Sequence, residues 1–170
     1  MGLSASYVAV SDDELSSLER LDPDAVASAV ADAMWTRWAD NPSAGIETQW
    51  HGLHFVLTGR DDSTSISGVP LSEAVLGTFD FDTGSGAYAT IVTAARVPEL
   101  LGALRAVDRE ALVDGFEPAR LAERDIYPAT IWLRDSPKAL VLALLDALDT
   151  LTTFYEAAHS RGLGVLVQVL

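Results

Sequence analysis

The sequence contains no cysteine among its 170 residues. This excludes a disulfide framework, an iron–sulfur cluster, a cysteine-ligated zinc site and a thiol nucleophile. Basic residues are also scarce, since 11 Lys and Arg stand against 25 Asp and Glu and give a net charge of −14 at pH 7. Binding to a phosphate backbone needs a basic surface, so we expect no nucleic-acid partner.

Long apolar segments are missing as well. The longest stretch without Asp, Glu, Lys or Arg, residues 83–95, has 13 residues and contains Gly, Ser and Thr, so it cannot cross a bilayer. No basic residue precedes Arg20, and no apolar segment of the signal-peptide type follows the start. We therefore expect a cytoplasmic protein with no membrane partner.

The apolar content points to one folded domain over residues 1–170. Apolar residues make up 49% of the chain, which is ordinary for a folded protein. Residues 4–10 alternate in a pattern that indicates a strand, and residues 164–170 form a nearly continuous apolar run typical of a strand covered on both faces. We predict a helix-rich α/β fold in which a small mixed sheet contains both terminal strands.

Helix start signals recur along the chain. Ser11 and Glu14 form a capping box, and both Asp22 and Ser136 precede a proline. With the apolar spacing, these signals predict helices over residues 11–20, 22–41, 50–59, 70–77, 97–107 and 136–159, and a short helix after Asp108. On the second helix, apolar residues recur every four positions, at Val26, Val30, Met34 and Trp38. We also predict a strand over residues 88–94, a turn or short linker over 41–45 and an extended segment near Trp132.

Three short motifs between residues 80 and 89 match the sequence patterns of known sites, but their surroundings in the sequence do not fit those sites. A glycine fingerprint begins at Gly84, but a strand-forming segment follows it where dinucleotide binding needs a helix. The Asp82-Thr83-Gly84 triplet of aspartic proteases would need a second copy. Asp80 and Asp82 could hold a hard cation, but Ile91 stands where a calcium loop needs Glu. We interpret this region as a polar turn and expect no bound cofactor.

The histidines His51 and His54 stand three residues apart, as two metal ligands on one helix would. A zinc site needs further ligands, and no cysteine can supply them, so we expect no metal. His54 shares an apolar face with Trp50, Leu53 and Leu57. It is therefore either a hydrogen-bonded core histidine or a general base or ligand contact.

The candidate site residues are Trp50, His54, Thr58 and Tyr127. The first three stand at i, i+4 and i+8 and lie along one helix face. If the loop at Tyr127 packs against that face, a pocket with apolar walls and a few polar tips results. The alternative is that the aromatic residues belong to the core and that Thr58 and Gly59 end the helix.

Several segments together resemble the YfbM-like family of small bacterial proteins, classed as a domain of unknown function. They are Trp50-x-x-Leu53-His54-x-x-Leu57-Thr58-Gly59, Pro70-Leu71-Ser72, Gly77, Ile126-Tyr127-Pro128 and the closing stretch from Phe154 to Ala158. The family pattern carries over to Trp50, His54, Thr58, Gly59, Tyr127 and Pro128. The resemblance implies a single three-layer α/β/α domain and implies no activity.

Three functions remain open. The favoured hypothesis is a non-enzymatic interaction module, of the inhibitor, adaptor or toxin-neutralising type, because strong negative charge steers a protein toward a basic protein partner. The second hypothesis is a small-molecule binding protein or enzyme that uses a pocket around His54 and Tyr127. The third is a homo-oligomeric structural protein, suggested by the apolar C-terminal strand.

Overall fold

The structure of the chain is a computed structural model that describes residues 2–81 and 88–170. The Asp82-Thr83-Gly84 triplet, the Asp80 and Asp82 pair, the glycine motif at Gly84 and the turn predicted around them fall wholly or partly outside the described residues.

A five-stranded sheet forms the middle of the molecule, in the order β2-β1-β5-β4-β3. Its strands are β1 (Ala5–Val10), β2 (Ser43–Glu47), β3 (Phe79–Phe81), β4 (Tyr88–Val92) and β5 (Gly164–Val169). The first and last strands of the chain are neighbours at the centre, paired from Ala5 opposite Val169 to Val10 opposite Gly164. The predicted helix-rich α/β class, with both terminal strands inside the sheet, is confirmed.

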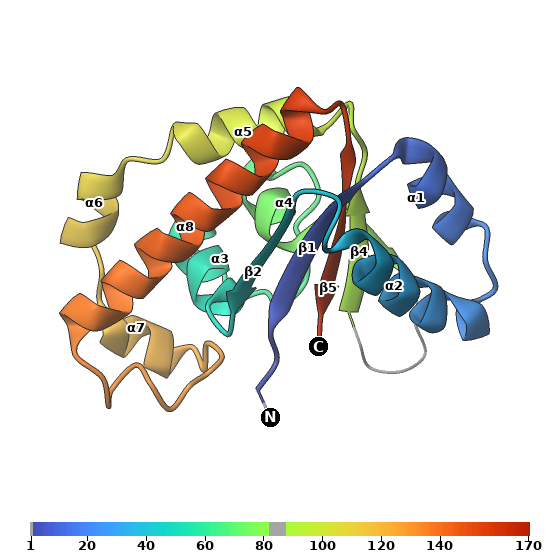
Figure 1. The fold of residues 1–170 in the computed structure, drawn as a ribbon. Helices are drawn as coiled ribbons and strands as arrows, with labels where there is room; N and C mark the ends of the chain where they lie inside the picture. The colour runs from blue at the N-terminus through green and yellow to red at the C-terminus, as the bar shows by residue number, and fades with distance from the viewer. Residues whose placement is uncertain (1, 82–87) are drawn as a thin grey trace.

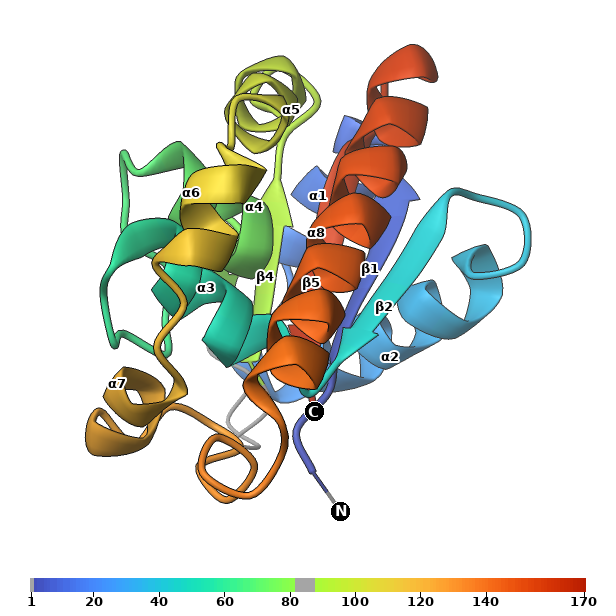
Figure 2. The same cartoon turned by 90° about the vertical axis from the view of Figure 1, so that its left-hand side faces the viewer.

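Helices cover both faces of this sheet and give three layers (Figures 1 and 2). One face carries α1 (Asp12–Glu19) and α2 (Pro23–Arg37). The other carries α3 (Trp50–Thr58), α4 (Pro70–Leu76), α5 (Val97–Arg105) and α8 (Pro137–Ser160), with α6 (Arg109–Asp114) and α7 (Pro118–Glu123) farther out. In the described part of the chain, no helix is both long enough and apolar enough to cross a membrane.

The expectation of a mixed sheet is wrong, because all four strand pairings are antiparallel. Two helices, α1 and α2, separate β1 from β2, and they return the chain to the end of the sheet where β1 finished. Ser43 at the start of β2 therefore lies opposite Val8. The single helix α8 likewise delivers Gly164 to a position opposite Val10.

The two faces of the sheet bury cores of unequal size. Because side chains alternate along a strand, Tyr7 and Val167 point into the large core under α3, α4, α5 and α8, while Val8 and Leu166 point into a smaller core under α1 and α2. The smaller core ends at Met34 on α2. Beyond Met34 the helix continues without burying a further side chain.

Local sequence signals explain most of the elements. The capping box at Ser11 and Glu14 is present, and the side chains of Asp108 and Ser136 cap α6 and α8. Three elements were missed, since residues 43–47 form β2 and not a linker, and neither β3 nor α7 was expected. The extended segment expected near Trp132 is instead a series of turns, in which the Trp132 indole donates to the carbonyl of Ile126 at 2.6 Å.

The close contact between α3 and the Trp132 turn yields a stability prediction. A Cβ on Gly52 would lie 2.5 Å from Cη2 of Trp132 and 3.3 Å from Cδ2 of Leu144. We expect Gly52→Ala to lower the free energy of unfolding by about 1–3 kcal/mol, the usual effect of overpacking. Gly102→Ala in α5 is the matched control, because that Cβ meets nothing within 4 Å and should leave stability unchanged or slightly higher. Urea unfolding of both variants measures the difference, and equal stabilities would contradict the packing.

Candidate functional site

His54 is the predicted site residue with the least access to solvent. Its side chain is 0% exposed, and its Nε2 lies 2.8 Å from the hydroxyl of Ser72, which is also fully buried. The Ser72 hydroxyl also accepts a hydrogen bond from the N–H of Ile66. His54 thus joins α3 to the start of α4 and to the loop before it, as a core histidine would.

Burial also sets the ionisation of the two histidines. The pKa of His54 is lowered to about 4. Burial is the main cause, the neighbouring His51 acts in the same direction, and the Asp62 carboxylate acts in the opposite direction. Burial likewise lowers the pKa of His51, against an opposing effect of Asp61. His54 is therefore neutral at pH 7, and its Nδ1 has no hydrogen-bond partner within the described residues.

Trp50 and Tyr127 come together around the N-terminal segment. The Trp50 indole donates to the carbonyl of Leu3 at 3.2 Å, and the Tyr127 hydroxyl accepts from the N–H of the same residue at 2.6 Å. The two rings stack with centroids 6.0 Å apart, and His51 Nδ1 accepts from the backbone N–H of Tyr127 at 3.0 Å. A Cβ on Gly2 would clash with the Tyr127 hydroxyl, so a larger residue there would require the Tyr127 side chain to shift.

Thr58 forms hydrogen bonds at the C-terminal end of α3. Its hydroxyl donates to the carbonyl of His54 at 2.7 Å and accepts from the N–H of Arg60, while Gly59 closes the helix with a φ of 71°. The four predicted residues therefore lie on one helix and one loop, as expected. Trp50 and Tyr127 are in contact, whereas His54 and Thr58 bind other partners. A ligand-binding role for this set stays a prediction.

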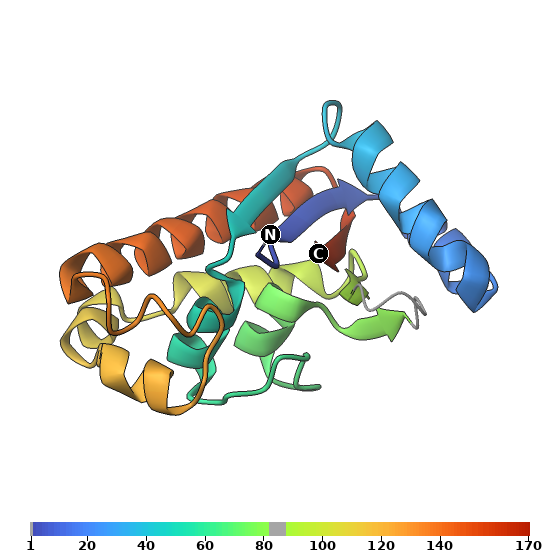
Figure 3. The ribbon, with the colours of Figure 1, turned by 90° about the horizontal axis from the view of Figure 1, so that it is seen from below.

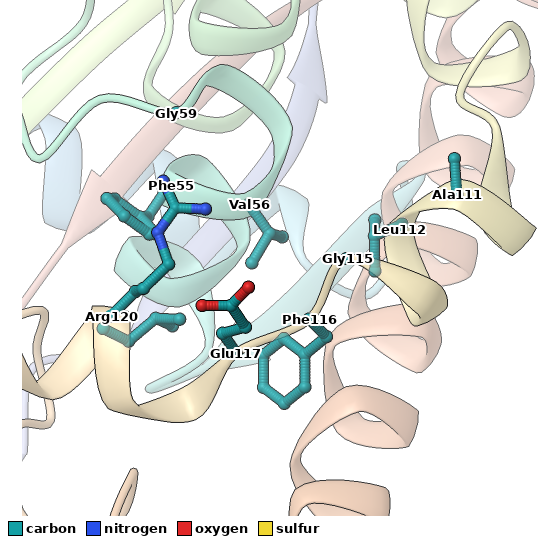
Figure 4. Close-up of a pocket in the computed structure, with 10 residues that line it drawn as sticks. Phe55, Val56, Gly59, Ala111, Leu112, Gly115, Phe116, Glu117 and Arg120 are labelled. Carbon is teal, nitrogen blue, oxygen red and sulfur yellow. The ribbon is translucent and has the colours of Figure 1, made fainter.

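A small cavity lies beside α3, on the side of α6 and α7 (Figure 4). It has a volume of about 150 Å³, and Phe55, Val56 and Leu121 contribute to its apolar lining. Glu117 and Arg120 also line it, and neither takes part in an ion pair within the described chain. At about 30 Å³ for each water molecule, it has room for a few waters or a very small ligand.

A larger opening is a groove between the end of α2 and the sheet. Its volume is about 530 Å³, and we call it the tryptophan groove. Two indoles form its exposed wall, since Trp35 is 85% exposed and Trp38 is 42% exposed. Ser6 of β1 and Gln168 of β5 lie on the sheet side. The full lining is Ser6, Ala31, Met34, Trp35, Trp38, Ala39 and Gln168.

On the sheet side, the groove residues Ser6 and Gln168 stand next to the first residue of β1 and the last residue of β5. In the view from below, α2 and α8 lie on opposite sides of the sheet (Figure 3). Large exposed indoles are unusual on a folded protein, and contiguous apolar surface often marks a binding site.

Exposed carboxylates accompany the two tryptophans. Residues 21–42 contain four acidic residues and one basic residue. Asp32 stands three residues before Trp35, so the two side chains are neighbours on the helix surface, and Asp40 follows the last groove residue of this segment. Neither carboxylate takes part in an ion pair with another described residue.

The nearby cations are engaged elsewhere. Arg37, the basic residue of this segment, binds the carboxylate of Glu14 in α1. Arg161 reaches the backbone carbonyl of Asp40 at 3.4 Å, not its carboxylate. The tryptophan groove therefore combines an apolar wall with two carboxylates that form no ion pair within the described residues.

Comparisons with known proteins place the chain in a family. Residues 1–168 match the sequence model of DUF1877, described as a domain of unknown function. The chain belongs to the DUF1877 family. The resemblance drawn from the segments around Trp50, His54 and Tyr127 is thereby confirmed.

The chain is also similar to Protein YfbM of Escherichia coli strain K12. YfbM is 26% identical to this chain over 125 residues, which cover 74% of this chain and 75% of YfbM. The crystal structure of YfbM, titled as a protein of unknown function, matches with a TM-score of 0.77 and 20% identity. The match covers 98% of this chain and 99% of that one, so the two proteins share a fold.

Sequence reasoning missed three residues that shape these sites within the DUF1877 fold. Ser72 was quoted only as part of a family segment, and nothing local marks it as the partner of His54. Trp35 falls outside the four-residue apolar spacing of its helix, which is a sign of exposure. Gln168 is the one polar side chain in residues 163–170, and that anomaly could have been noticed.

The depressed pKa of His54 predicts a pH dependence of stability. The folded protein holds His54 neutral, whereas the unfolded chain takes up a proton near pH 6.5. His54 therefore contributes to the free energy of unfolding above pH 6.5, and this contribution is lost as the pH falls toward 4. Between pH 7.5 and 5.5 we expect His54 to account for a loss of roughly 1 kcal/mol, which His54→Gln should remove.

Urea unfolding at the two pH values measures this difference, and NMR of the His54 ring in the unaltered protein serves as a check that does not depend on the variant. A ring that titrates near pH 6.5 in the folded protein would contradict the assignment.

Proposed function

We propose that the protein is a non-enzymatic interaction module that binds a basic protein partner in the bacterial cytoplasm. The observation that carries this proposal is the exposed pair Trp35 and Trp38 in the tryptophan groove. Inhibitor, adaptor and toxin-neutralising roles all fit such a module.

The indole pair supports binding because tryptophan is enriched among the residues that dominate protein interfaces. A side chain that is 85% exposed contributes little to the stability of the folded chain, so packing does not explain Trp35. A partner that covers both indoles would bury a large apolar area without a change in the fold.

Charge supports the choice of a basic partner. The whole chain carries −14, and Asp32 and Asp40 beside the groove have no ion-pair partner in the described residues. Opposite charge accelerates encounter and disfavours acidic competitors. Cationic side chains can also stack on the indole faces.

The alternative function, a small-molecule protein or enzyme around His54 and Tyr127, has one observation in its favour. A serine hydroxyl 2.8 Å from an imidazole is an arrangement that can activate a nucleophile. Both residues are 0% exposed, so a substrate could reach them only if the loop over α4 opened. Under the alternative, a fluorophosphonate probe would label Ser72, whereas the interaction module would show no labelling.

Photo-crosslinking in living bacteria tests the proposed function. A photoreactive amino acid at position 35 should form an adduct with one basic protein. The matched control is the same amino acid at position 142, because Leu142 is 48% exposed on α8, on the other side of the sheet. No adduct specific to position 35, or an adduct with an acidic protein, would overturn the proposal.

The purified pair then provides a quantitative check. Trp35→Ala and Trp38→Ala should each weaken binding by roughly 2 kcal/mol, the scale of an interface hot spot, and added salt should weaken it further. Leu142→Ala should leave the affinity unchanged. Tryptophan variants that bind as tightly as the unaltered protein would contradict the location of the site.

A further inference from the structure

The sheet side of the tryptophan groove contains two polar side chains that face each other across neighbouring strands. Ser6 of β1 lies directly opposite Gln168 of β5 in the antiparallel register. Directly opposed residues point to the same face of a sheet, and both side chains line the groove. They form its floor, while Trp35 and Trp38 form its wall.

Gln168 carries an amide that reaches the groove. The residue is only 9% exposed, but its amide atoms are not fully buried, and the residue lines the groove. Within the described chain the side chain of Gln168 makes no hydrogen bond, and the hydroxyl of Ser6 has no partner either. The donors and acceptors of this amide, in an otherwise apolar strand, are therefore free to bind a group that enters the groove.

The chemistry of the groove selects among the groups that a basic partner can present. A guanidinium has flat faces that stack on indoles and edge N–H groups that donate to the Gln168 carbonyl oxygen and the Ser6 hydroxyl. A lysine ammonium is a strongly hydrated point charge and cannot use face and edge together. The remaining donors, on the amide NH₂ of Gln168, are free to bind a partner backbone carbonyl or water.

We infer that the tryptophan groove binds an arginine side chain of the partner, which is inserted between the indoles and the Ser6 and Gln168 pair. This inference rests on the proposed function and adds the identity of the recognised side chain. Asp32 and Asp40 supply the long-range attraction, and the floor supplies the selectivity for arginine over lysine.

Short capped peptides that are identical except at two positions test the inference. Those positions carry arginine, lysine or citrulline, and citrulline is the uncharged shape analogue of arginine. The probe signals are the indole N–H resonances of Trp35 and Trp38, with the buried Trp50 and Trp132 as internal controls. We expect the arginine peptide to bind about tenfold more tightly than the lysine peptide, the scale of one hydrogen bond to a charged group, and the citrulline peptide to bind weakest.

Gln168→Leu should reduce the affinity for the arginine peptide about tenfold and leave the affinity for the lysine peptide nearly unchanged. The variant should fold, because it replaces an amide that makes no hydrogen bond within the described chain with an apolar group of similar size. Thr150→Leu, an exposed position on α8, is the matched control and should change neither affinity.

The outcomes separate this inference from the proposed function. Equal binding of the arginine and lysine peptides, above that of citrulline, would overturn the arginine selectivity and leave the basic-partner proposal standing. Arginine preference that persists in Gln168→Leu would overturn the role of the floor. No shift of Trp35 or Trp38 with any peptide, or citrulline binding equal to arginine, would overturn both.

Discussion

The antiparallel pairing of the first strand with the last is the constraint on which the rest of the structure depends. Both strands are central, and both of their faces are covered over most of their length, so their register decides which side chains enter which core. A slip of one residue would send Tyr7 toward α2 and Val8 toward α8. The same register places Ser6 opposite Gln168, so the floor of the tryptophan groove is a direct consequence of the pairing of β1 with β5.

The helices distribute unequally around this central pair. Among the described residues, the helices α3 to α8 lie on the side of the large core, while α1 and α2 cover the other face. The buried residues of α2 end at Met34, and the chain then turns toward β2 at the edge of the sheet. Trp35 and Trp38 therefore lie where the helix has passed the apolar part of the sheet. Their exposure is a consequence of topology and not of poor packing elsewhere.

The sequence predicted the elements whose formation depends on neighbouring residues in the chain. The capping box at Ser11 marks the start of α1, the glycine after Thr58 marks the end of α3, and the apolar run marks the last strand. β2 was missed because its alternation, with Ala44 and Ile46 inside, spans only five residues and acquires meaning only beside β1. Likewise, the burial of His54 against Ser72 and the exposure of Trp38 depend on how distant elements meet. A spacing rule places residues on a face, but the neighbouring element decides whether that face is covered.

The negative charge explains how such a surface can stay exposed on a folded chain. Exposed indoles favour association of two copies through their tryptophan grooves. Each copy carries a net charge of −14, and Asp32 and Asp40 lie beside its groove without an ion pair in the described residues. Electrostatic repulsion therefore opposes this association. With a basic partner, the electrostatic interaction becomes attractive. The apolar surface of the two indoles is still buried in that complex. The same residues that keep the protein apart from its own copies thus favour a partner of opposite charge, and Gln168 adds a requirement that charge alone cannot meet.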